Sequence, residues 1–179
     1  MGLILLRHTT PAIEPGICYG QTNLAVADTF EAEATAIVAA LPPYTYIVTS
    51  PLIRCAQLAQ FIGRHASLAV ETDPRLIEMD FGSWEGRAWS AIPRTELDAW
   101  AGDFLHARPH GGESVAMLRV RALAALMDWR EANEPTLIVT HAGIIKAALA
   151  TGNEAGDFDA KIDFGGFVNL SFEGRALYE

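Results

Sequence analysis

The sequence predicts an α/β protein, a three-layer sandwich in which helices flank a mostly parallel central sheet. Short apolar runs such as residues 3–6 and 136–140 are typical of buried strands. Between them lie segments, such as residues 29–41, in which apolar residues recur at helical spacing. This alternation favours parallel strands, because a parallel pair needs a crossover connection that a helix usually supplies.

The strands are predicted from apolar runs bounded by turn-forming residues. They cover residues 3–6, 44–49, 68–71, 136–140, 167–172 and 176–178, the last two around a turn at Gly174.

The helices are predicted from helical spacing and from residues that begin or end a helix. Pro42-Pro43 ends the helix at residues 29–41, and Ser50 as N-cap with Pro51 begins a helix that runs to Gly63. One or two short helices are expected within residues 89–105, and another helix from His141. A long helix is expected from near Glu113, with a core face formed by Val115, Leu118, Ala122, Ala125 and Trp129.

Length and composition indicate a single folded domain over residues 1–179. Half of the residues are hydrophobic, and neither an internal repeat nor a low-complexity linker divides the chain. The net charge of −9 argues against nucleic acid or an anionic membrane as a partner. The apolar start of the chain is too short for a signal peptide, and Cys18 and Cys55 do not make a disulfide framework. We therefore expect a cytoplasmic protein.

Reactive or charged side chains follow four of the predicted strands. Arg7-His8 follows the first, residues 50–54 the second, Glu78 the third and His141 the fourth. Carboxyl ends of parallel strands meet at one edge of a sheet, where the sites of such folds gather. We therefore expect these side chains to form one site.

These residue types suit phosphoryl transfer. Arginines such as Arg7 and Arg54 bind phosphate oxygens through two parallel N–H groups. A neutral imidazole is a nucleophile at pH 7, and this reasoning leaves open whether His8 or His141 takes that role. Glu78 can donate a proton to the leaving oxygen if burial raises its pKa.

Four segments in order resemble the histidine phosphatase (phosphoglycerate-mutase-like) superfamily. They are Leu6-Arg7-His8, Thr-Ser-Pro-Leu-Ile-Arg-Cys at residues 49–55, Ile-Glu-Met-Asp-Phe-Gly-Ser-Trp-Glu-Gly at residues 77–86, and Val-Thr-His-Ala-Gly at residues 139–143. The resemblance implies a phosphoglycerate-mutase-like fold, and it extends from residue 3 to about residue 150.

The resemblance also implies a role for each matching residue. His8 would be the nucleophile that becomes phosphohistidine, while Arg7, Arg54 and His141 would hold the phosphoryl group. Glu78 would act first as acid and then as base for water, and its motif position favours it over Asp80 and Glu85. Neither a metal nor another cofactor is implied.

Further contacts with the substrate are expected from Thr9, Tyr19, Gln21, Thr22 and Ala142, although Tyr19, Gln21 and Thr22 can equally be ordinary loop residues. The chain departs from the family at two positions. Thr9 replaces the usual glycine, and Glu14 stands where mutase-like members carry asparagine. A glutamate would repel phosphate, so we expect Glu14 outside the pocket and Gln21 or Thr22 as the neutral donor in its place.

Residues 18–24, 78–86 and 109–114 look like those of the alpha-ribazole phosphatases, a branch that removes the 5′-phosphate of a benzimidazole riboside in cobalamin synthesis. A broad-specificity sugar- or nucleotide-phosphate phosphatase is the alternative within enzymes. A phosphoglycerate mutase is less favoured, since the substrate loops lack a further basic cluster. From another class, a non-catalytic phospho-ligand binding or regulatory module stays open. The expected partner is a small phosphomonoester, and a homodimer is left open.

Overall fold

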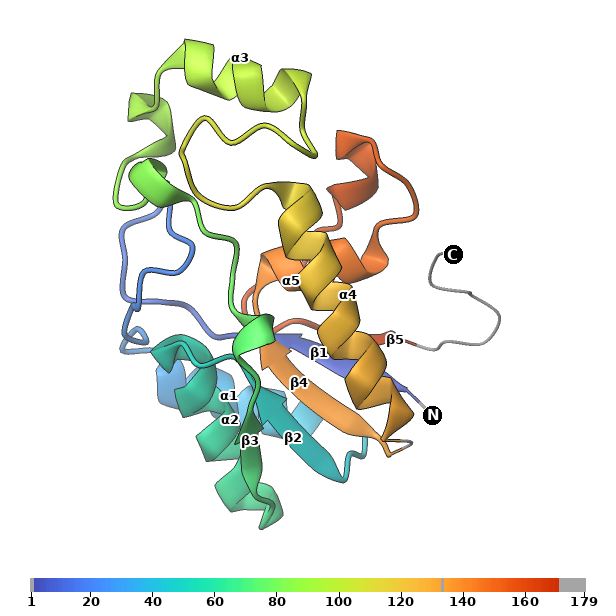
Figure 1. Cartoon of the computed structure of the whole chain (residues 1–179). Coiled ribbons are helices and arrows are strands. Elements are labelled where there is room, and N and C mark those ends of the chain that lie inside the picture. Colours follow the sequence, from blue (N-terminus) through green and yellow to red (C-terminus); the bar gives the residue numbers. More distant parts are fainter. Residues whose placement is uncertain (1, 133, 171–179) are drawn as a thin grey trace.

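A five-stranded sheet forms the middle of the molecule (Figure 1). The computed structural model describes residues 2–132 and 134–170. The strands are β1 (Leu3–Arg7), β2 (Tyr46–Thr49), β3 (Val70–Thr72), β4 (Thr136–Thr140) and β5 (Phe167–Leu170). Their order across the sheet is β3-β2-β4-β1-β5, and only the pairing of β5 with β1 is antiparallel. The strand expected at residues 176–178 lies outside the described residues.

Helices connect the parallel strands, as expected. They are α1 (Phe30–Ala40), α2 (Ile53–Ala66), α3 (Arg94–Gly102), α4 (Val115–Glu131) and α5 (Ala142–Leu149). Short 3-10 helices η1 (Pro74–Leu76), η2 (Gly82–Trp84), η3 (Trp89–Ala91) and η4 (Ala155–Phe158) lie in the connections.

Alternate residues of each strand pack on opposite sides of the sheet and give the three layers. Leu6 and Val139 belong to a buried cluster that α1 and α2 cover, together with Leu58. Leu5 and Ile138 belong to a second cluster beneath α4 and α5. Both faces of the strands are therefore buried, which explains why they appear in the sequence as continuous apolar runs. The prediction of an α/β sandwich with a mostly parallel sheet is confirmed.

The second helix differs from its prediction at both ends. Helix α2 begins at Ile53, whose amide donates to Asn23 Oδ1 at 2.8 Å, whereas the hydroxyl of Ser50 contacts His141 Nε2 at 2.7 Å. Gly63 lies inside the helix. Glycine suits this position because a Cβ there would come within 2.9 Å of the Leu68 carbonyl oxygen. The prediction mistook a close-packing glycine for a helix end.

Smaller differences concern other element ends. Helix α4 begins at Val115, with Ser114 Oγ accepting the Met117 amide at 3.2 Å. Trp129 is only partly buried, and its Nε1 donates to Asp73 at 2.9 Å. Strands β2 and β3 begin two residues later than predicted. These shifts are the usual uncertainty of element boundaries.

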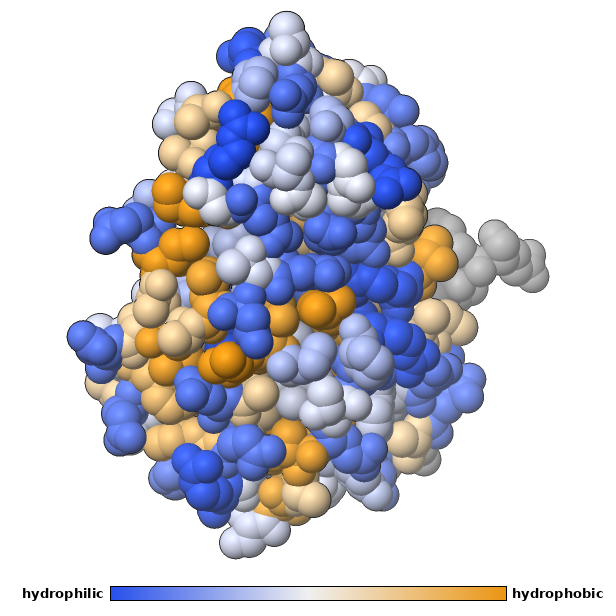
Figure 2. All heavy atoms as spheres, turned by 60° about the vertical axis from the view of Figure 1, so that its left-hand side comes forward, coloured by the Kyte–Doolittle hydropathy of each residue, from blue (hydrophilic) through white to orange (hydrophobic). Residues whose placement is uncertain are grey.

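The connection from β3 to α4 projects beyond the carboxyl edge of the sheet and carries α3 (Figure 1). A third buried cluster of Cys18, Trp84 and Ile92 joins this projection to the loop that follows β1. Trp84 is therefore a packing residue. Figure 2 shows apolar residues gathered across the middle of the neighbouring face, with hydrophilic residues around them. Within the described residues, no helix is long and apolar enough to cross a membrane.

Candidate active site

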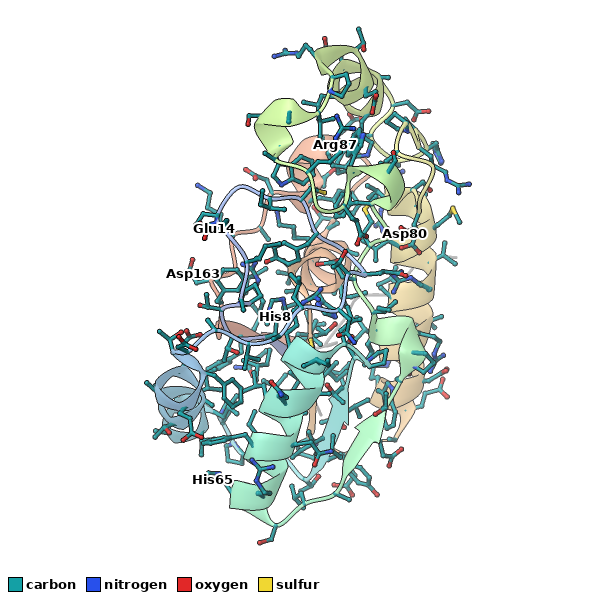
Figure 3. The ribbon with its side chains drawn as sticks, turned by 90° about the vertical axis from the view of Figure 1, so that its left-hand side faces the viewer. His8, Glu14, His65, Asp80, Arg87 and Asp163 are labelled. Atoms are coloured by element: carbon teal, nitrogen blue, oxygen red, sulfur yellow. The ribbon has the colours of Figure 1, made fainter. Side chains whose placement is uncertain are left out.

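His8 and His141 lie side by side at the carboxyl edge of the sheet. Arg7 at the end of β1 pairs with Thr140 at the end of β4, so the next residue of each strand is a histidine. The centroids of the two rings are 5.3 Å apart. The helices that follow β1 and β4 cover opposite faces of the sheet, which makes this the switch point where ligands bind in such folds. Figure 3 shows His8 near the middle of this side of the molecule.

The imidazole of His8 is held with one nitrogen ready to react. The ring is buried, and its Nδ1 lies 2.7 Å from the backbone oxygen of Thr9. A carbonyl oxygen can only accept, so Nδ1 carries the hydrogen. Nε2 then keeps a free electron pair, which accepts a hydrogen bond from Arg54 Nε at 3.2 Å.

Both histidines are held in the neutral form. Burial, with Arg54 and Arg7 nearby, lowers the pKa of His8 to about 3, although the bond to Thr9 opposes this. Burial and the charge of Arg54 also place the pKa of His141 well below its usual value. At pH 7 both rings are therefore neutral, and His8 can act as a nucleophile.

Arg54 is fully buried and is fixed by three contacts. Besides Nε to His8, its Nη1 donates to the Thr22 carbonyl at 2.8 Å and its Nη2 to the Gly20 carbonyl at 2.7 Å. The guanidinium carbon also lies 5.3 Å from the centroid of the Tyr19 ring. The loop after β1 thus fixes the orientation of Arg54 beside His8.

Glu85 holds this loop in turn. Its carboxylate accepts the amide of Gln21 at 2.9 Å and the amide of Thr22 at 2.8 Å, and it also binds the Thr22 hydroxyl. The Gln21 side-chain nitrogen donates to the Glu78 carbonyl at 3.1 Å. In this structure both side chains support the loop, and the role of either one as a neutral donor to phosphate stays a prediction.

Arg7 lies on the other side of His8. Its Nη1 donates to the Ile162 carbonyl at 2.7 Å, and the guanidinium stacks 3.8 Å from the centroid of the Phe164 ring. Its Nε is buried and has no hydrogen-bond partner among the described residues. The Tyr19 hydroxyl interacts with Arg7, and burial raises the pKa of Tyr19, so the phenol stays a neutral donor. Arg7 and Tyr19 therefore offer N–H and O–H groups beside the nucleophile.

The side chain of Glu78 contacts the first turn of α5. Its Oε1 accepts the Met79 amide at 2.8 Å, and its Oε2 accepts the Gly143 amide at 3.1 Å. Each oxygen keeps a further lone pair for a proton or a substrate. The two neighbouring acids face elsewhere. Asp80 accepts the Gly82 amide at 2.8 Å and points away from His8 (Figure 3), while Glu85 binds the loop after β1.

A partly buried ion pair fixes the backbone that carries Glu78. Arg121 Nε donates to Glu113 Oε1 at 2.7 Å, and Nη1 and Nη2 donate to the carbonyls of residues 75, 77 and 78. The sequence places Glu113 near a helix start and in the segment 109–114 that resembles the alpha-ribazole phosphatases, and it does not single out Arg121. Glu113 precedes α4 and Arg121 lies within it, and their spacing of eight residues gives no sign of this role in the sequence alone.

The remaining candidates divide into near and distant residues. Thr9 is buried next to His8, and its hydroxyl has no partner among the described residues. Ala142 is the first residue of α5, where backbone N–H groups lack partners within the helix. Glu14 is exposed and points outward (Figure 3), as expected. Phe164, which covers Arg7 and lies 5.6 Å from the His8 ring, was not identified from the sequence because it follows no motif.

The described residues contain no group of three or more histidine, cysteine, aspartate or glutamate side chains that could hold a metal ion. What the site does offer is a neutral imidazole, two guanidinium groups and a carboxyl group at one edge of an α/β sheet. This combination fits an enzyme that handles phosphoryl groups.

Comparison with known proteins identifies the family. The model of the histidine phosphatase superfamily (branch 1) matches residues 3–174, and the chain belongs to this superfamily. A glucosyl-3-phosphoglycerate phosphatase of Mycobacterium tuberculosis is 33% identical over 165 residues, which cover 83% of this chain and 73% of that protein. The solved structure of the mycobacterial glucosyl-3-phosphoglycerate phosphatase matches 95% of this chain and 89% of that chain, with a TM-score of 0.80 and 26% identity.

Two other relatives carry different names. The adenosylcobalamin/alpha-ribazole phosphatase of Escherichia coli is 28% identical over 112 residues, or 60% of this chain and 55% of that protein. A phosphoglycerate mutase from Thermus thermophilus matches 99% of this chain and 97% of that chain, with a TM-score of 0.78 and 27% identity. The superfamily and its phosphoglycerate-mutase-like fold are thereby confirmed, whereas the relatives differ in substrate.

Proposed function

We propose that this protein is a metal-independent phosphomonoesterase that carries the phosphoryl group on Nε2 of His8. The observation that supports this best is the contact of His8 Nδ1 with the backbone oxygen of Thr9 at 2.7 Å. The Thr9 carbonyl fixes the hydrogen on Nδ1, and the hydrogen bond that Arg54 donates to Nε2 identifies Nε2 as the nitrogen with the lone pair. A buried, neutral imidazole with an oriented lone pair is the form that attacks phosphorus.

In the first step His8 Nε2 forms a bond to phosphorus while the bond from phosphorus to the ester oxygen breaks. Arg7 and Arg54 stabilise the charge on the phosphoryl oxygens, and His141 and the first amide of α5 at Ala142 lie beside them. Glu78 donates its proton to the leaving oxygen, so the product is a neutral alcohol.

In the second step water attacks the phosphohistidine. Glu78, now a carboxylate, takes a proton from the water while the water oxygen forms a bond to phosphorus. The bond from phosphorus to His8 Nε2 breaks, which releases inorganic phosphate and restores the neutral imidazole. One carboxyl group therefore acts as acid and then as base, and the cycle needs no external reagent other than water.

Alpha-ribazole 5′-phosphate is the substrate that we propose first, because the segments around Tyr19, Glu78 and Glu113 resemble that branch. The product would be alpha-ribazole, a precursor of the cobalamin nucleotide loop. Glucosyl-3-phosphoglycerate is a second candidate, favoured by the 33% identity to the mycobacterial phosphatase that is named for it. A broad range of sugar or nucleotide phosphates is the third.

Phosphate release in the presence of EDTA tests the proposal. The purified protein is incubated with alpha-ribazole 5′-phosphate, glucosyl-3-phosphoglycerate and a panel of common phosphomonoesters. A single preferred ester identifies the substrate, whereas similar rates on all of them indicate broad specificity. Phosphate-ester binding without turnover would overturn the enzyme proposal in favour of a binding module.

A second measurement addresses the intermediate. Acid-sensitive, base-stable labelling of the protein by a radioactive phosphomonoester is expected for the wild type and is expected to vanish in His8→Ala. Near-normal turnover by His8→Ala would exclude the mechanism. Phosphoryl exchange between two phosphoglycerates would instead favour a mutase.

A further inference from the structure

A cavity of about 540 Å³ lies between α3, α4, α5 and η4, next to the proposed acid. Its size falls within the range of small-molecule sites. Four aromatic residues contribute to its wall, namely Phe81, Trp100, Phe104 and Phe158. Aliphatic side chains complete most of the rest, and the charged residues that line it are Glu78, Lys146 and Asp159. Figure 1 shows α3 above the N-terminal end of α4, the region that encloses this space. The cavity is therefore a largely apolar space between α3 and the helices α4 and α5.

The cavity and the catalytic edge share part of their wall. Glu78, Ala142 and Gly143 line the cavity. Ala142 and Gly143 form the start of α5 next to His141, and Glu78 accepts the Gly143 amide there. Glu78 is thus in contact with both spaces. An ester oxygen that takes the proton of Glu78 would therefore lie next to the cavity.

The direction of the reaction places the leaving group near this space. The attacking nitrogen and the leaving oxygen lie roughly in line through phosphorus. Since Glu78 protonates the leaving oxygen, the alcohol must lie on the Glu78 side of the phosphoryl group and away from His8. The part of the alcohol beyond that oxygen then meets the aromatic wall.

We infer that this cavity binds the alcohol portion of the substrate and selects phosphomonoesters whose alcohol carries a flat aromatic group. This inference rests on the proposed function of the same site. Rings such as Trp100 and Phe104 make favourable stacking or edge contacts with another aromatic ring. They offer few hydrogen-bond partners to the hydroxyl groups of a sugar. Trp100 Nε1 is buried without a hydrogen-bond partner among the described residues, so the indole packs here as an apolar surface.

The test uses two esters with the same kind of leaving oxygen, 2-(1-naphthyl)ethyl phosphate and ethyl phosphate. Ala155 is exposed on η4 and lines the cavity, so Ala155→Trp fills the space from its rim. Ala124→Trp, at an exposed position of α4 outside the cavity wall, is the matched control. We expect the wild type to prefer the naphthyl ester by about 10-fold or more in kcat/KM. Ala155→Trp should remove this preference without slowing ethyl phosphate, and Ala124→Trp should retain it.

Binding of the product alcohol 2-(1-naphthyl)ethanol, followed by tryptophan fluorescence, separates the cavity from the chemistry. Saturable binding that Ala155→Trp weakens about 10-fold supports the cavity even if neither ester is hydrolysed, an outcome that would contradict only the proposed function. If the alcohol does not bind, or if both tryptophan variants lose it equally, the inference is overturned while hydrolysis through His8 can still hold.

Discussion

The carboxylate of Glu78 occupies the space that a side chain at Gly143 would need. A Cβ built at Gly143 would lie 2.1 Å from Glu78 Oε1, and the Gly143 amide donates to Oε2 of the same carboxylate at 3.1 Å. Glycine at this position therefore lets the proposed acid reach the first turn of α5.

We predict that Gly143→Ala displaces Glu78 and lowers kcat by about 10²-fold on alkyl phosphates, the scale of general acid catalysis. p-Nitrophenyl phosphate should be affected much less, because its leaving group departs without a proton. Steady-state kinetics on both esters checks this. Gly102→Ala is the control, since a Cβ there meets no atom within 4 Å. An equal loss on both esters would contradict the role of Glu78 as acid.

The position of the reactive edge could be predicted from local sequence. His8 and His141 each follow a continuous apolar strand, and the parallel pairing of those strands brings the two rings together. The proposed acid, Glu78, was assigned by its motif. In the structure its carboxylate accepts the amide of Gly143 in the first turn of α5. Contacts between segments that are distant in the sequence, such as that of Gly143 with Glu78, could not be predicted from the spacing of residues along the chain.

The supporting residues were harder to predict for a physical reason. Glu85 and Arg121 act on backbone groups of distant segments, and backbone amides and carbonyls carry no sequence identity. Gln21 and Thr22 were considered as phosphate donors because their side chains are polar, yet polar side chains also hold loops together. The difference between the two roles depends on tertiary contacts.

We predict that Arg121→Lys lowers kcat about 10- to 100-fold with little change in KM. A lysine cannot donate to Glu113 and to three carbonyls at once, so the backbone at residues 75–78 shifts and Glu78 is misplaced. Kinetics with an alkyl phosphate checks this. Arg94→Lys, whose ion pair with Asp98 is exposed, should behave as the wild type. An equal effect on p-nitrophenyl phosphate would indicate a merely structural role.

We predict that Glu85→Gln destabilises the fold by about 1–3 kcal/mol. The substitution replaces one carboxylate oxygen with an NH2 group, so backbone amides that Glu85 now accepts would face a donor and lose their acceptor. The pKa of Glu85 indicates the same arrangement. Burial would raise it, but the bonds from Thr22, Gln21 and Phe81 together lower it. The loop that fixes Arg54 should loosen, so KM for a phosphomonoester should rise. Urea unfolding and kinetics check both effects, with exposed Glu71→Gln as control. An unchanged KM in Glu85→Gln would show that the loop held by Glu85 does not contribute to substrate binding, and it would contradict this prediction.

The buried, neutral state of His8 predicts how stability depends on pH. The folded pKa of about 3 lies below the ordinary value of 6.5, mainly because burial disfavours the charged ring. The unfolded chain therefore binds the proton more readily, and this contribution to stability is fully present above pH 6.5 and declines as the pH falls toward 3. The loss approaches about 1.4 kcal/mol per pH unit for one histidine. Since the pKa of His141 is lowered as well, both rings contribute.

His8→Gln removes the titrating ring, so we predict a shallower fall in stability on acidification than in the wild type, by up to about 1.4 kcal/mol per pH unit. Urea unfolding of both proteins at pH 8, 7, 6 and 5 measures this slope. Between pH 8 and 7 the His8 ring is neutral in the folded chain and mostly neutral in the unfolded chain, so the two proteins should change nearly in parallel there. A parallel change from pH 6 to 5 as well would mean that His8 is not held neutral by the fold, which would remove the main support for its role as the nucleophile.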